Sequence, residues 1–246
     1  MNFKDCIDSY PFILMEGALG ERLKREFDLD ISGTVAMADL IYQQKGRMAL
    51  KTLWNEYMDI AHRYQLPFLA TTPTRRANKE RVYMAGYNES IITDNVDFLR
   101  TIKETANVNM YIGGLMGCKG DAYTSERALN QEEAIAFHSW QASLFKSVGV
   151  DFLYAGIMPV LSEAIGMAVA MSDTDIPYII SFTIQRNGKL IDGHTINDAI
   201  YYIDNHVSNK PVCYMTNCVH PDIVYEALSH KFNQTQMVKN RFWGIQ

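Results

Sequence analysis

The sequence predicts an α/β fold of the (β/α)8-barrel type. Short apolar runs, rich in β-branched and aromatic residues, alternate along the chain with longer amphipathic stretches, as parallel strands joined by helices do. The runs are apolar at odd and even positions alike, which is typical of strands buried on both faces. No glycine-rich dinucleotide fingerprint follows any of them, and this disfavours a doubly wound nucleotide-binding sheet. A chain of 246 residues, 48% of them hydrophobic, is long enough for one such barrel.

Seven strands are predicted, most of them bounded by Gly, Pro or Asn. They are Phe12–Met15, Pro67–Thr71, Val108–Gly114, Asp151–Gly156, Tyr178–Ile184, Val212–Asn217 and Arg241–Ile245. A closed barrel needs eight strands. The last three candidates start at similar intervals, so we expect the next strand to fall beyond residue 246. Residues 1–246 are therefore predicted to be a single barrel domain that ends around strand seven.

Two amphipathic stretches between these strands are predicted helices. The first places Leu50, Leu53, Trp54, Tyr57, Ile60, Ala61 and Tyr64 on one face. The second has Phe137, Trp140, Leu144 and Val148 on one face, Glu132 and Glu133 in its first turn, and Gly149 just past its end. Both patterns have the helical period and the end signals of helices packed on a sheet. We expect the three tryptophans, Trp54, Trp140 and Trp243, to lie in the core.

Composition excludes several classes of protein. The formal net charge is −5 and no long Lys/Arg run occurs, which argues against a nucleic-acid or anionic-membrane partner. The amino terminus carries Asp5 and Asp8 and lacks the apolar core of a secretory signal. No stretch approaches the ~20 apolar residues of a membrane-spanning helix. Four scattered cysteines without a CxxC pair predict reduced thiols. These features together predict a soluble, cytoplasmic protein.

The carboxyl ends of the predicted strands carry the candidate functional residues, because active sites of such barrels form there. In chain order they are Glu16 and Gly17; Thr71, Thr72 and Thr74; Gly113 and Gly114; Gly156; Ser181 and Thr183; Asn217 and Cys218. The set contains one carboxylate, one thiol and many small residues that leave room for a ligand. It predicts a site for a small molecule.

The thiol of Cys218 has two interpretations. A lone cysteine is commonly a packed or idle thiol, but soft sulfur is also a preferred ligand of zinc. His220, two residues later, is a conceivable second ligand, although a histidine beside a proline after a strand more commonly belongs to a loop.

The charged candidates also have alternative roles. Glu16 either charges the amino terminus of the helix that begins near Gly20 or receives an ammonium group of a ligand. Arg75 and Arg76 are either solvated and paired with acids or hold a carboxylate at the mouth of the site. For Glu163, in the first helical turn after strand four, an interaction with the helix dipole is a sufficient explanation.

Five segments in order resemble the homocysteine S-methyltransferase family, a group of zinc-dependent barrels. They are MEGALGERL (15–23), GGLMGCKGDAY (113–123), GVDFLYAGIMPVLSEA (149–164), ISFTIQRNGKLIDGHTINDAI (180–200) and TNCVHP (216–221). The resemblance covers nearly all of residues 1–246, and the order and spacing of the segments are specific for the family fold.

The resemblance implies a function and a cofactor. It implies a Zn²⁺ ion held by three thiolates, one of them Cys218, that stabilises the thiolate of homocysteine for attack on an activated methyl group, giving methionine. It also implies that the substrate is bound by the strand-end residues Glu16, Gly17, Thr72, Ser181 and Asn217. The partners are then a thiol acceptor and a methyl donor, with a homo-oligomer or a corrinoid protein as further options.

The sequence departs from the family pattern in four places. The adjacent Cys-Cys pair that follows strand eight in the family does not occur within residues 1–246. The family's strand-four Glu-Thr aligns with Gly156 and Ile157, and losing a buried carboxylate that binds an ammonium group costs about 2–5 kcal/mol. The opening Asp is Glu16. The strand-two Asn-Thr-aromatic pattern is Thr71-Thr72-Pro73, followed by the arginine pair. The alternative is therefore a non-catalytic or repurposed barrel that binds a small molecule, or a corrinoid-partnered subunit.

Overall fold

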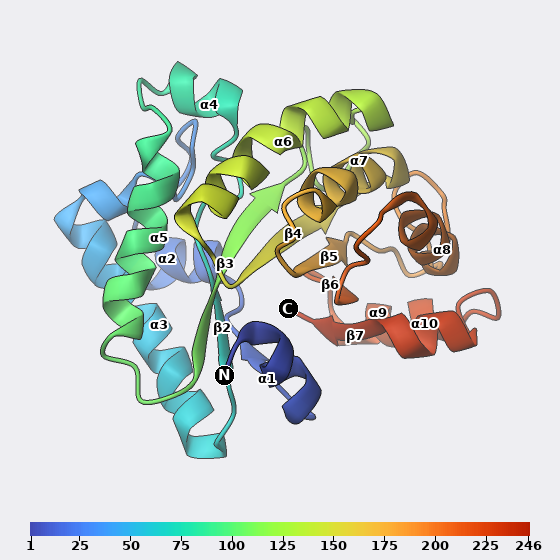
Figure 1. Ribbon diagram of the computed structural model, residues 1–246, viewed down its shortest axis with the longest axis horizontal. Helices are drawn as coiled ribbons and strands as arrows, with labels where there is room; N and C mark the ends of the chain where they lie inside the picture. The colour runs from blue at the N-terminus through green and yellow to red at the C-terminus, as the bar shows by residue number, and fades with distance from the viewer. The chain divides into compact units, whose positions relative to one another are not determined.

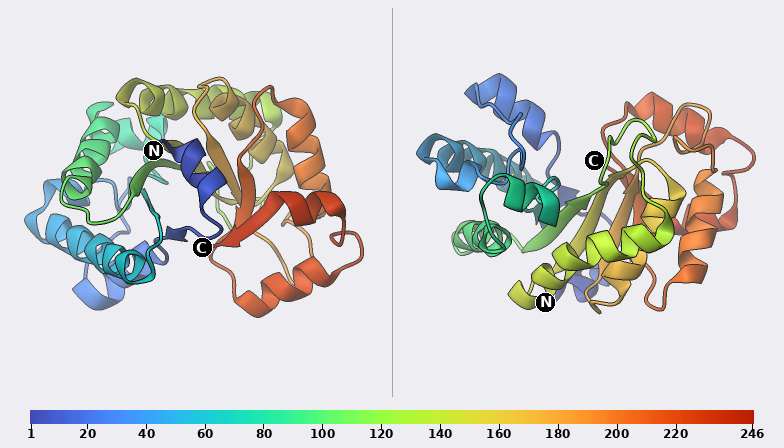
Figure 2. Two further views of the ribbon diagram at one scale, coloured as in Figure 1. Left: turned by 60° about the horizontal axis from the view of Figure 1, so that its bottom comes forward. Right: turned by 90° about the horizontal axis from the view of Figure 1, so that it is seen from above.

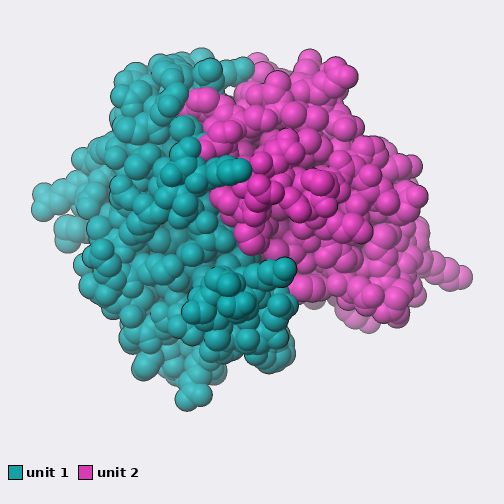
Figure 3. All heavy atoms as spheres, viewed as in Figure 1, with its two compact units in different colours: residues 1–115, 144–152 teal, residues 116–143, 153–246 magenta.

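The computed structural model describes residues 1–246, and these divide into two compact units (Figure 3). The first unit comprises Met1–Leu115 and Leu144–Phe152, and the second comprises Met116–Ser143 and Leu153–Gln246. Both are α/β structures in which strands and helices alternate. None of the helices combines the length and the apolar character needed to cross a bilayer.

The first unit contains three parallel strands and the helices between them (Figure 1). Its elements are α1 (Phe3–Ser9), β1 (Leu14–Met15), α2 (Leu19–Phe27), the 3-10 helix η1 (Leu40–Tyr42), α3 (Gln44–Tyr64), β2 (Phe68–Thr71), α4 (Lys79–Met84), α5 (Ser90–Lys103) and most of β3 (Met110–Gly117). Leu14 is in register with Phe68, and Phe68 with Met110. This register brings the carboxyl ends of β1 and β2 to the same edge of the sheet. Glu16, which follows β1, and Thr71, which ends β2, are neighbours there.

The second unit contains four parallel strands in chain order (Figure 2). Its elements are most of α6 (Gln131–Val148) and of β4 (Phe152–Met158), α7 (Leu161–Ser172), β5 (Tyr178–Phe182), α8 (Ile196–His206), β6 (Cys213–Thr216), α9 (Pro221–Ser229), α10 (Gln236–Arg241) and β7 (Phe242–Ile245). Helices α7 and α8 lie side by side, as do α8 and α10. Ile180 is in register with Tyr214, so Ser181 and Asn217 both lie at the carboxyl edge.

The seven predicted strands are thus confirmed, as is the α/β fold with parallel pairing. Strands β2, β4, β5 and β6 are buried along their whole length, as predicted for strands covered on both faces. Residues 1–246 contain seven strands, so a closed eight-stranded barrel is not seen within them.

The amino-terminal helix α1 packs on the core of the first unit. Its Asn2 cap accepts a hydrogen bond from the Asp5 amide, and the buried Phe3 ring stacks on Phe152 with centroids 4.7 Å apart. Phe3 also meets the edge of Tyr111 at 5.8 Å. The hydroxyl of Tyr111 donates to the carbonyl oxygen of Met1 at 3.3 Å. The first residues of the chain are therefore part of the folded unit.

Several predicted core residues are exposed. Helix α3 buries Leu50, Leu53 and Trp54 as expected, but Ile60 is 40% and Tyr64 65% exposed. They lie in the last turns of α3, near its end at Tyr64. Trp243 is 54% exposed because β7 alternates half-buried and exposed residues. The expectation that Trp243 lies in the core is therefore wrong.

Candidate functional site

The predicted site residues lie at the carboxyl ends of strands in both units, and each unit has its own group. In the first unit Glu16 and Gly17 follow β1, and Thr71 to Thr74 end or follow β2. In the second unit Ser181 lies in β5, and Asn217 and Cys218 follow β6. The placement after strands agrees with the sequence prediction.

Glu16 is the buried carboxyl group of the first unit. Its side chain is 2% exposed, and its Oε1 accepts hydrogen bonds from the Thr71 amide at 2.8 Å and the Thr71 hydroxyl at 2.6 Å. Burial raises the pKa of Glu16 to about 7, although the Thr71 hydrogen bonds lower it in part. The carboxyl group therefore holds its proton to a higher pH than an exposed glutamate does. A cationic group placed against it would favour the charged form.

Helix α2 does not use this carboxyl group as a cap. The helix begins at Leu19 after Ala18, which has a left-handed φ of 52°, and no side chain caps its first turn. Gly17 lies between Glu16 and the helix and has no side chain. Its carbonyl oxygen accepts a hydrogen bond from the Tyr57 hydroxyl at 2.6 Å. A Cβ atom at Gly17 would meet only the Tyr57 oxygen, at 4.0 Å. The backbone here is fixed and its surroundings are open.

Thr72 takes part in a closed ring of hydrogen bonds between β2 and β3. Thr74 Oγ1 donates to the Leu115 carbonyl oxygen at 2.8 Å, which uses its only proton. Thr72 Oγ1 must therefore donate to Thr74 Oγ1 at 2.7 Å, and it accepts from the Leu115 amide at 3.1 Å. Both hydroxyls are fully buried. The ring fixes the backbone where β2 ends.

Gly113 and Gly114 do not leave room for a ligand, contrary to the expectation from sequence. A Cβ atom at Gly113 would lie 2.4 Å from Phe152 Cζ, and one at Gly114 would lie 2.6 Å from Phe145 Cγ. Aromatic side chains of the first unit already occupy this space. The two glycines allow close packing of β3 rather than binding.

Asn217 organises the group in the second unit. The side chain is 7% exposed, and its Oδ1 accepts from the Ser181 hydroxyl at 2.6 Å and from the Ile157 amide at 3.2 Å. Its Nδ2 donates to Cys218 Sγ at 3.8 Å. One carboxamide thus contacts β4, β5 and the thiol, and the predicted residues Ser181, Asn217 and Cys218 are brought together.

The end of β4 is irregular where Asn217 contacts it. The pairing with β5 shifts between Ala155 and Met158, and Ile157 has a φ of +58°. A β-branched residue in the left-handed region is strained, at a cost of order 1–3 kcal/mol. Sequence reasoning missed Ile157 as a site residue, because only the alignment with a neighbouring strand reveals the bulge.

Cys218 has an exposed side chain and a backbone in the left-handed region. Its φ is +57°, its amide donates to the Gln246 carbonyl oxygen at 3.2 Å, and its thiol is free of any disulfide. The thiol is therefore not packed in the core, and of the two interpretations an idle thiol and a metal ligand both fit its exposure. A zinc site needs about four ligands, however, and no group of three or more potential ligands gathers in residues 1–246. These residues supply one donor and do not form a metal site by themselves.

His220 and the two arginines do not extend this group. The Nδ1 atom of His220 accepts from the Asp222 amide at 3.2 Å, so this exposed side chain caps α9. Arg75 and Arg76 lie half-buried in the turn after β2.

Glu163 has a larger role than the helix-dipole interpretation gave it. Its fully buried carboxylate accepts hydrogen bonds from the Lys119 amide at 2.7 Å, His138 Nε2 at 3.1 Å and the Leu129 amide at 3.3 Å. Burial lowers the pKa of His138, so the imidazole is neutral at pH 7 and donates its Nε2 proton. A signal for this pair is His138 itself, which lies within the predicted α6 helix but off its expected apolar face.

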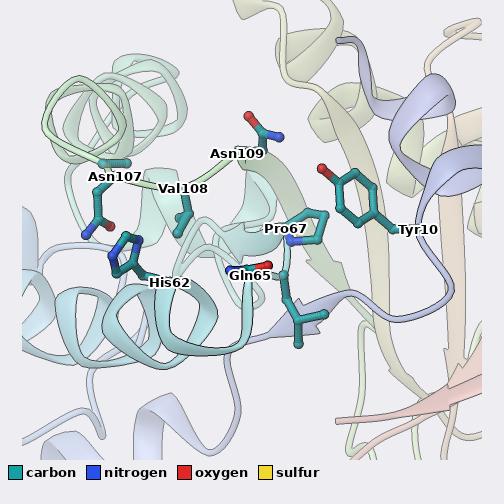
Figure 4. A pocket seen from close by; sticks show the side chains of 9 residues that line it. Tyr10, His62, Gln65, Pro67, Asn107, Val108 and Asn109 are labelled. Atoms are coloured by element: carbon teal, nitrogen blue, oxygen red, sulfur yellow. The ribbon is translucent and has the colours of Figure 1, made fainter.

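A pocket of about 610 Å³ lies at the other end of the strands in the first unit (Figure 4). Pro67 precedes β2 and Asn109 precedes β3, so the pocket is at the amino ends of these strands. His62, Gln65 and Asn107 also line it. It contains none of the predicted site residues, and it is therefore not the predicted site.

Comparisons with known proteins agree on one family. A family model described as homocysteine S-methyltransferase matches residues 13–241. Homocysteine S-methyltransferase YbgG of Bacillus subtilis (strain 168) is 21% identical in an alignment of 217 residues that covers 81% of this chain and 67% of that protein. The metallated form of the homocysteine methyltransferase MmuM from Escherichia coli matches with a TM-score of 0.77 and 18% identity, covering 98% of this chain and 93% of that chain. Its oxidized form matches with a TM-score of 0.75, at the same identity and coverage. The chain shares the fold of these structures.

Proposed function

Because the chain belongs to the homocysteine S-methyltransferase family, we propose that it transfers a methyl group to the thiol of homocysteine or of a related small thiol. The observation that carries this proposal is the match of the family model over residues 13–241, which include the strand-end groups of both units. With homocysteine as acceptor the product is methionine.

In this proposal Glu16 receives the ammonium group of the acceptor. Its carboxyl group is buried, is oriented by Thr71, and has a pKa of about 7. An ammonium ion beside it would lower that pKa and hold the group ionised, because opposite charges stabilise each other in a poorly hydrated site. The open backbone at Gly17 and the fixed end of β2 at Thr72 complete the first-unit contribution.

The second unit has its own group of neutral side chains. Ser181 and Asn217 hold the end of β4, and the amide of Asn217 contacts the Cys218 sulfur. No carboxylate takes part in this group, since the strand-four position is Gly156 followed by Ile157. Glu16 would then be the one anionic anchor for the acceptor among the proposed strand-end residues.

The proposed reaction balances without an external oxidant or reductant. The acceptor sulfur loses its proton to solvent and uses a lone pair to form a bond with the methyl carbon. The bond from that carbon to the donor breaks, and the donor atom keeps the electron pair. The positive atom of a sulfonium or quaternary ammonium donor thereby becomes neutral, and the nitrogen of a methylfolate donor takes up a proton from solvent.

Zinc enters the proposal only through Cys218. Thiolates are the preferred protein ligands of zinc, and the exposed Cys218 thiol follows the end of β6. The three-thiolate site therefore remains part of the proposal and requires donors other than those described.

The test is an activity assay on the full-length protein. Homocysteine is incubated with S-methylmethionine, betaine or methyltetrahydrofolate, and methionine is measured by mass spectrometry. We expect methionine with one of these donors, and a loss of at least 100-fold in kcat/KM for Cys218→Ala. Cys6→Ala, which removes a thiol of α1 away from the strand ends, is the thiol control and should retain activity. Zinc measured by elemental analysis should fall in Cys218→Ala, and unchanged zinc in that variant would refute the ligand assignment.

A second candidate function is a barrel that binds a small molecule without methyl transfer. The strand-four position supports it, because Gly156 and Ile157 carry no carboxylate there. In that case homocysteine or another thiol should raise the melting temperature while no donor yields methionine. A further arm adds a methylated corrinoid protein, and methionine formed only in that arm would identify a corrinoid-partnered subunit.

A further inference from the structure

Two loops of the second unit are fastened to the first turn of α7. One is the β3–α6 loop, residues 118–130, and the other is the β5–α8 loop, residues 183–195. Both follow the carboxyl ends of strands. None of the roles proposed above for substrate or metal uses the groups that fasten them.

Glu163 holds both ends of the β3–α6 loop. One carboxylate oxygen accepts from the Lys119 amide at the start of the loop, and the other accepts from the Leu129 amide at its end. The neighbouring Ser162 hydroxyl donates to the Leu129 carbonyl oxygen at 2.8 Å. The loop is therefore closed on itself through two adjacent residues of α7.

The β5–α8 loop is fastened to the same turn by a different carboxylate. Asp192 Oδ2 accepts from the amide of Leu161, the first residue of α7, at 2.6 Å. The Ile191 amide donates to the Pro159 carbonyl oxygen at 3.1 Å. The two loops also meet directly, because the Thr183 hydroxyl donates to the Ala122 carbonyl oxygen at 2.8 Å.

Burial makes the Glu163 connection strong. Its side chain is 0% exposed and that of His138 is 1% exposed, so no water competes for the three hydrogen bonds. Bonds from amide and imidazole N–H groups to a buried carboxylate are charge-assisted and stronger than neutral ones. The neutral imidazole of His138 supplies a donor from α6, so three segments converge on one carboxylate.

We infer that Glu163 and Asp192 are positioning residues that hold these two loops as one preassembled rim at the carboxyl ends of β4 and β5. The inference rests on the proposed function, in which the acceptor binds at this edge. The rim would present the loop backbones to the ligand in a fixed arrangement, so that binding does not require them to be ordered first.

Trypsin tests the rim, because each loop carries an exposed arginine. Arg127 lies in the first loop and Arg186 in the second. In Glu163→Gln one carboxylate oxygen is replaced by an NH2 group, which cannot accept a hydrogen bond. One of the two backbone N–H donors therefore loses its acceptor. We expect cleavage after Arg127 to become at least tenfold faster. Asp192→Asn should accelerate cleavage after Arg186. Glu132→Gln, an exposed substitution on α6, is the control and should change neither rate.

The activity readout distinguishes positioning from mere stability. In Glu163→Gln we expect KM for the thiol acceptor to rise at least fivefold, with kcat within twofold of the parent. If Glu163→Gln fails to fold, as judged by circular dichroism, His138→Gln removes the imidazole and leaves both loop bonds of Glu163. It should fold, with a smaller increase in cleavage after Arg127.

Unchanged cleavage after Arg127 in the folded variant would overturn the inference. So would faster cleavage with an unaltered KM, since the loops would then be fastened without serving binding. If no donor yields methionine in the parent protein, the proposed function fails separately. The affinity for the thiol, measured by calorimetry, then replaces KM in this comparison.

Discussion

Glu16 makes the stability of the protein depend on pH in a direction opposite to that of a salt-bridged acid. Its pKa is raised from 4.5 to about 7, so the folded state binds the proton more tightly than the unfolded state. Stability contributed by this group is complete below pH 4.5 and is lost as the pH rises through 7. A shift of this size corresponds to about 3 kcal/mol.

Glu16→Gln should remove that dependence. Glutamine can still accept the Thr71 hydrogen bonds through its oxygen, and it carries no charge at any pH. Between pH 4.5 and 8 the free energy of unfolding of the parent should fall as Glu16 ionises. In the variant this fall, measured by urea unfolding, should be smaller by about 3 kcal/mol. Glu132→Gln, which changes an exposed carboxylate, should keep the parental slope. An equal slope in Glu16→Gln would show that folding does not raise the pKa of this carboxyl group.

Asn217 should be more costly to remove than to replace by an isostere. Asn217→Ala leaves the buried Ile157 amide and Ser181 hydroxyl without an acceptor, at about 1–3 kcal/mol for each. Asn217→Asp loses the donor to Cys218 and adds a buried negative charge, which costs free energy. It keeps both acceptor interactions, and these become charge-assisted and offset part of that cost. We expect urea unfolding to rank the parent above Asn217→Asp, and Asn217→Ala lowest. Equal losses in the two variants would contradict the role of Oδ1.

At the level of residues, the sequence predicts strand-end positions but not their partners. Ser181, Asn217 and Cys218 were predicted from strand ends, and the structure brings them together. The strain at Ile157 and the partners of Glu163 could not be predicted, because each depends on residues at least 25 positions away that meet only after the strands pair. For Glu163, the neighbouring sequence predicts only a short-range interaction with the helix dipole.

Among the elements, the strands could be predicted more completely than the helix faces. Every predicted strand overlaps an observed one because continuous apolar runs leave little choice. For α6, the predicted face of Phe137, Trp140, Leu144 and Val148 is only half-buried. The buried residues of this helix include His138 and Gln141. Polar residues that satisfy their hydrogen bonds inside the protein are invisible to a pattern that counts apolar positions.

The packing of β3 yields a prediction about its glycines. Gly113→Ala would place a methyl group 2.4 Å from the Phe152 ring, and overpacking of this kind costs about 1–3 kcal/mol. We expect that loss in urea unfolding, with partial recovery in the double variant Gly113→Ala/Phe152→Leu. Gly33→Ala is the matched control, since its Cβ atom would have no neighbour within 4 Å. A silent Gly113→Ala would contradict the close packing.

For the molecule as a whole, the fold is better determined than the chemistry. The α/β class and the parallel strands follow from a pattern repeated along all 246 residues. The choice of substrate depends on a few side chains, such as Glu16 and Gly156, whose effect is a difference between small free energies. Structural similarity at 18% identity supports the fold.

Ligand binding by the whole protein should appear as thermal stabilisation. At a homocysteine concentration of 100 times Kd, mass action adds about 2.7 kcal/mol to stability. For a chain of this length that corresponds to a rise in Tm of about 5–10 °C. Differential scanning fluorimetry at pH 8 should show this rise in the parent and a smaller one in Glu16→Gln. Serine, which has the same ammonium and carboxylate groups but no thiol, is the control ligand.

The stacking of Phe3 on Phe152 has a practical consequence for anyone producing the protein. Met1 is 68% exposed, so a purification handle fused ahead of it has free space. Proteolytic removal of the first few residues, by contrast, would remove Phe3 and expose the apolar surface that its ring covers on Phe152. Protein truncated at this end should therefore aggregate on storage, while the intact protein stays in solution.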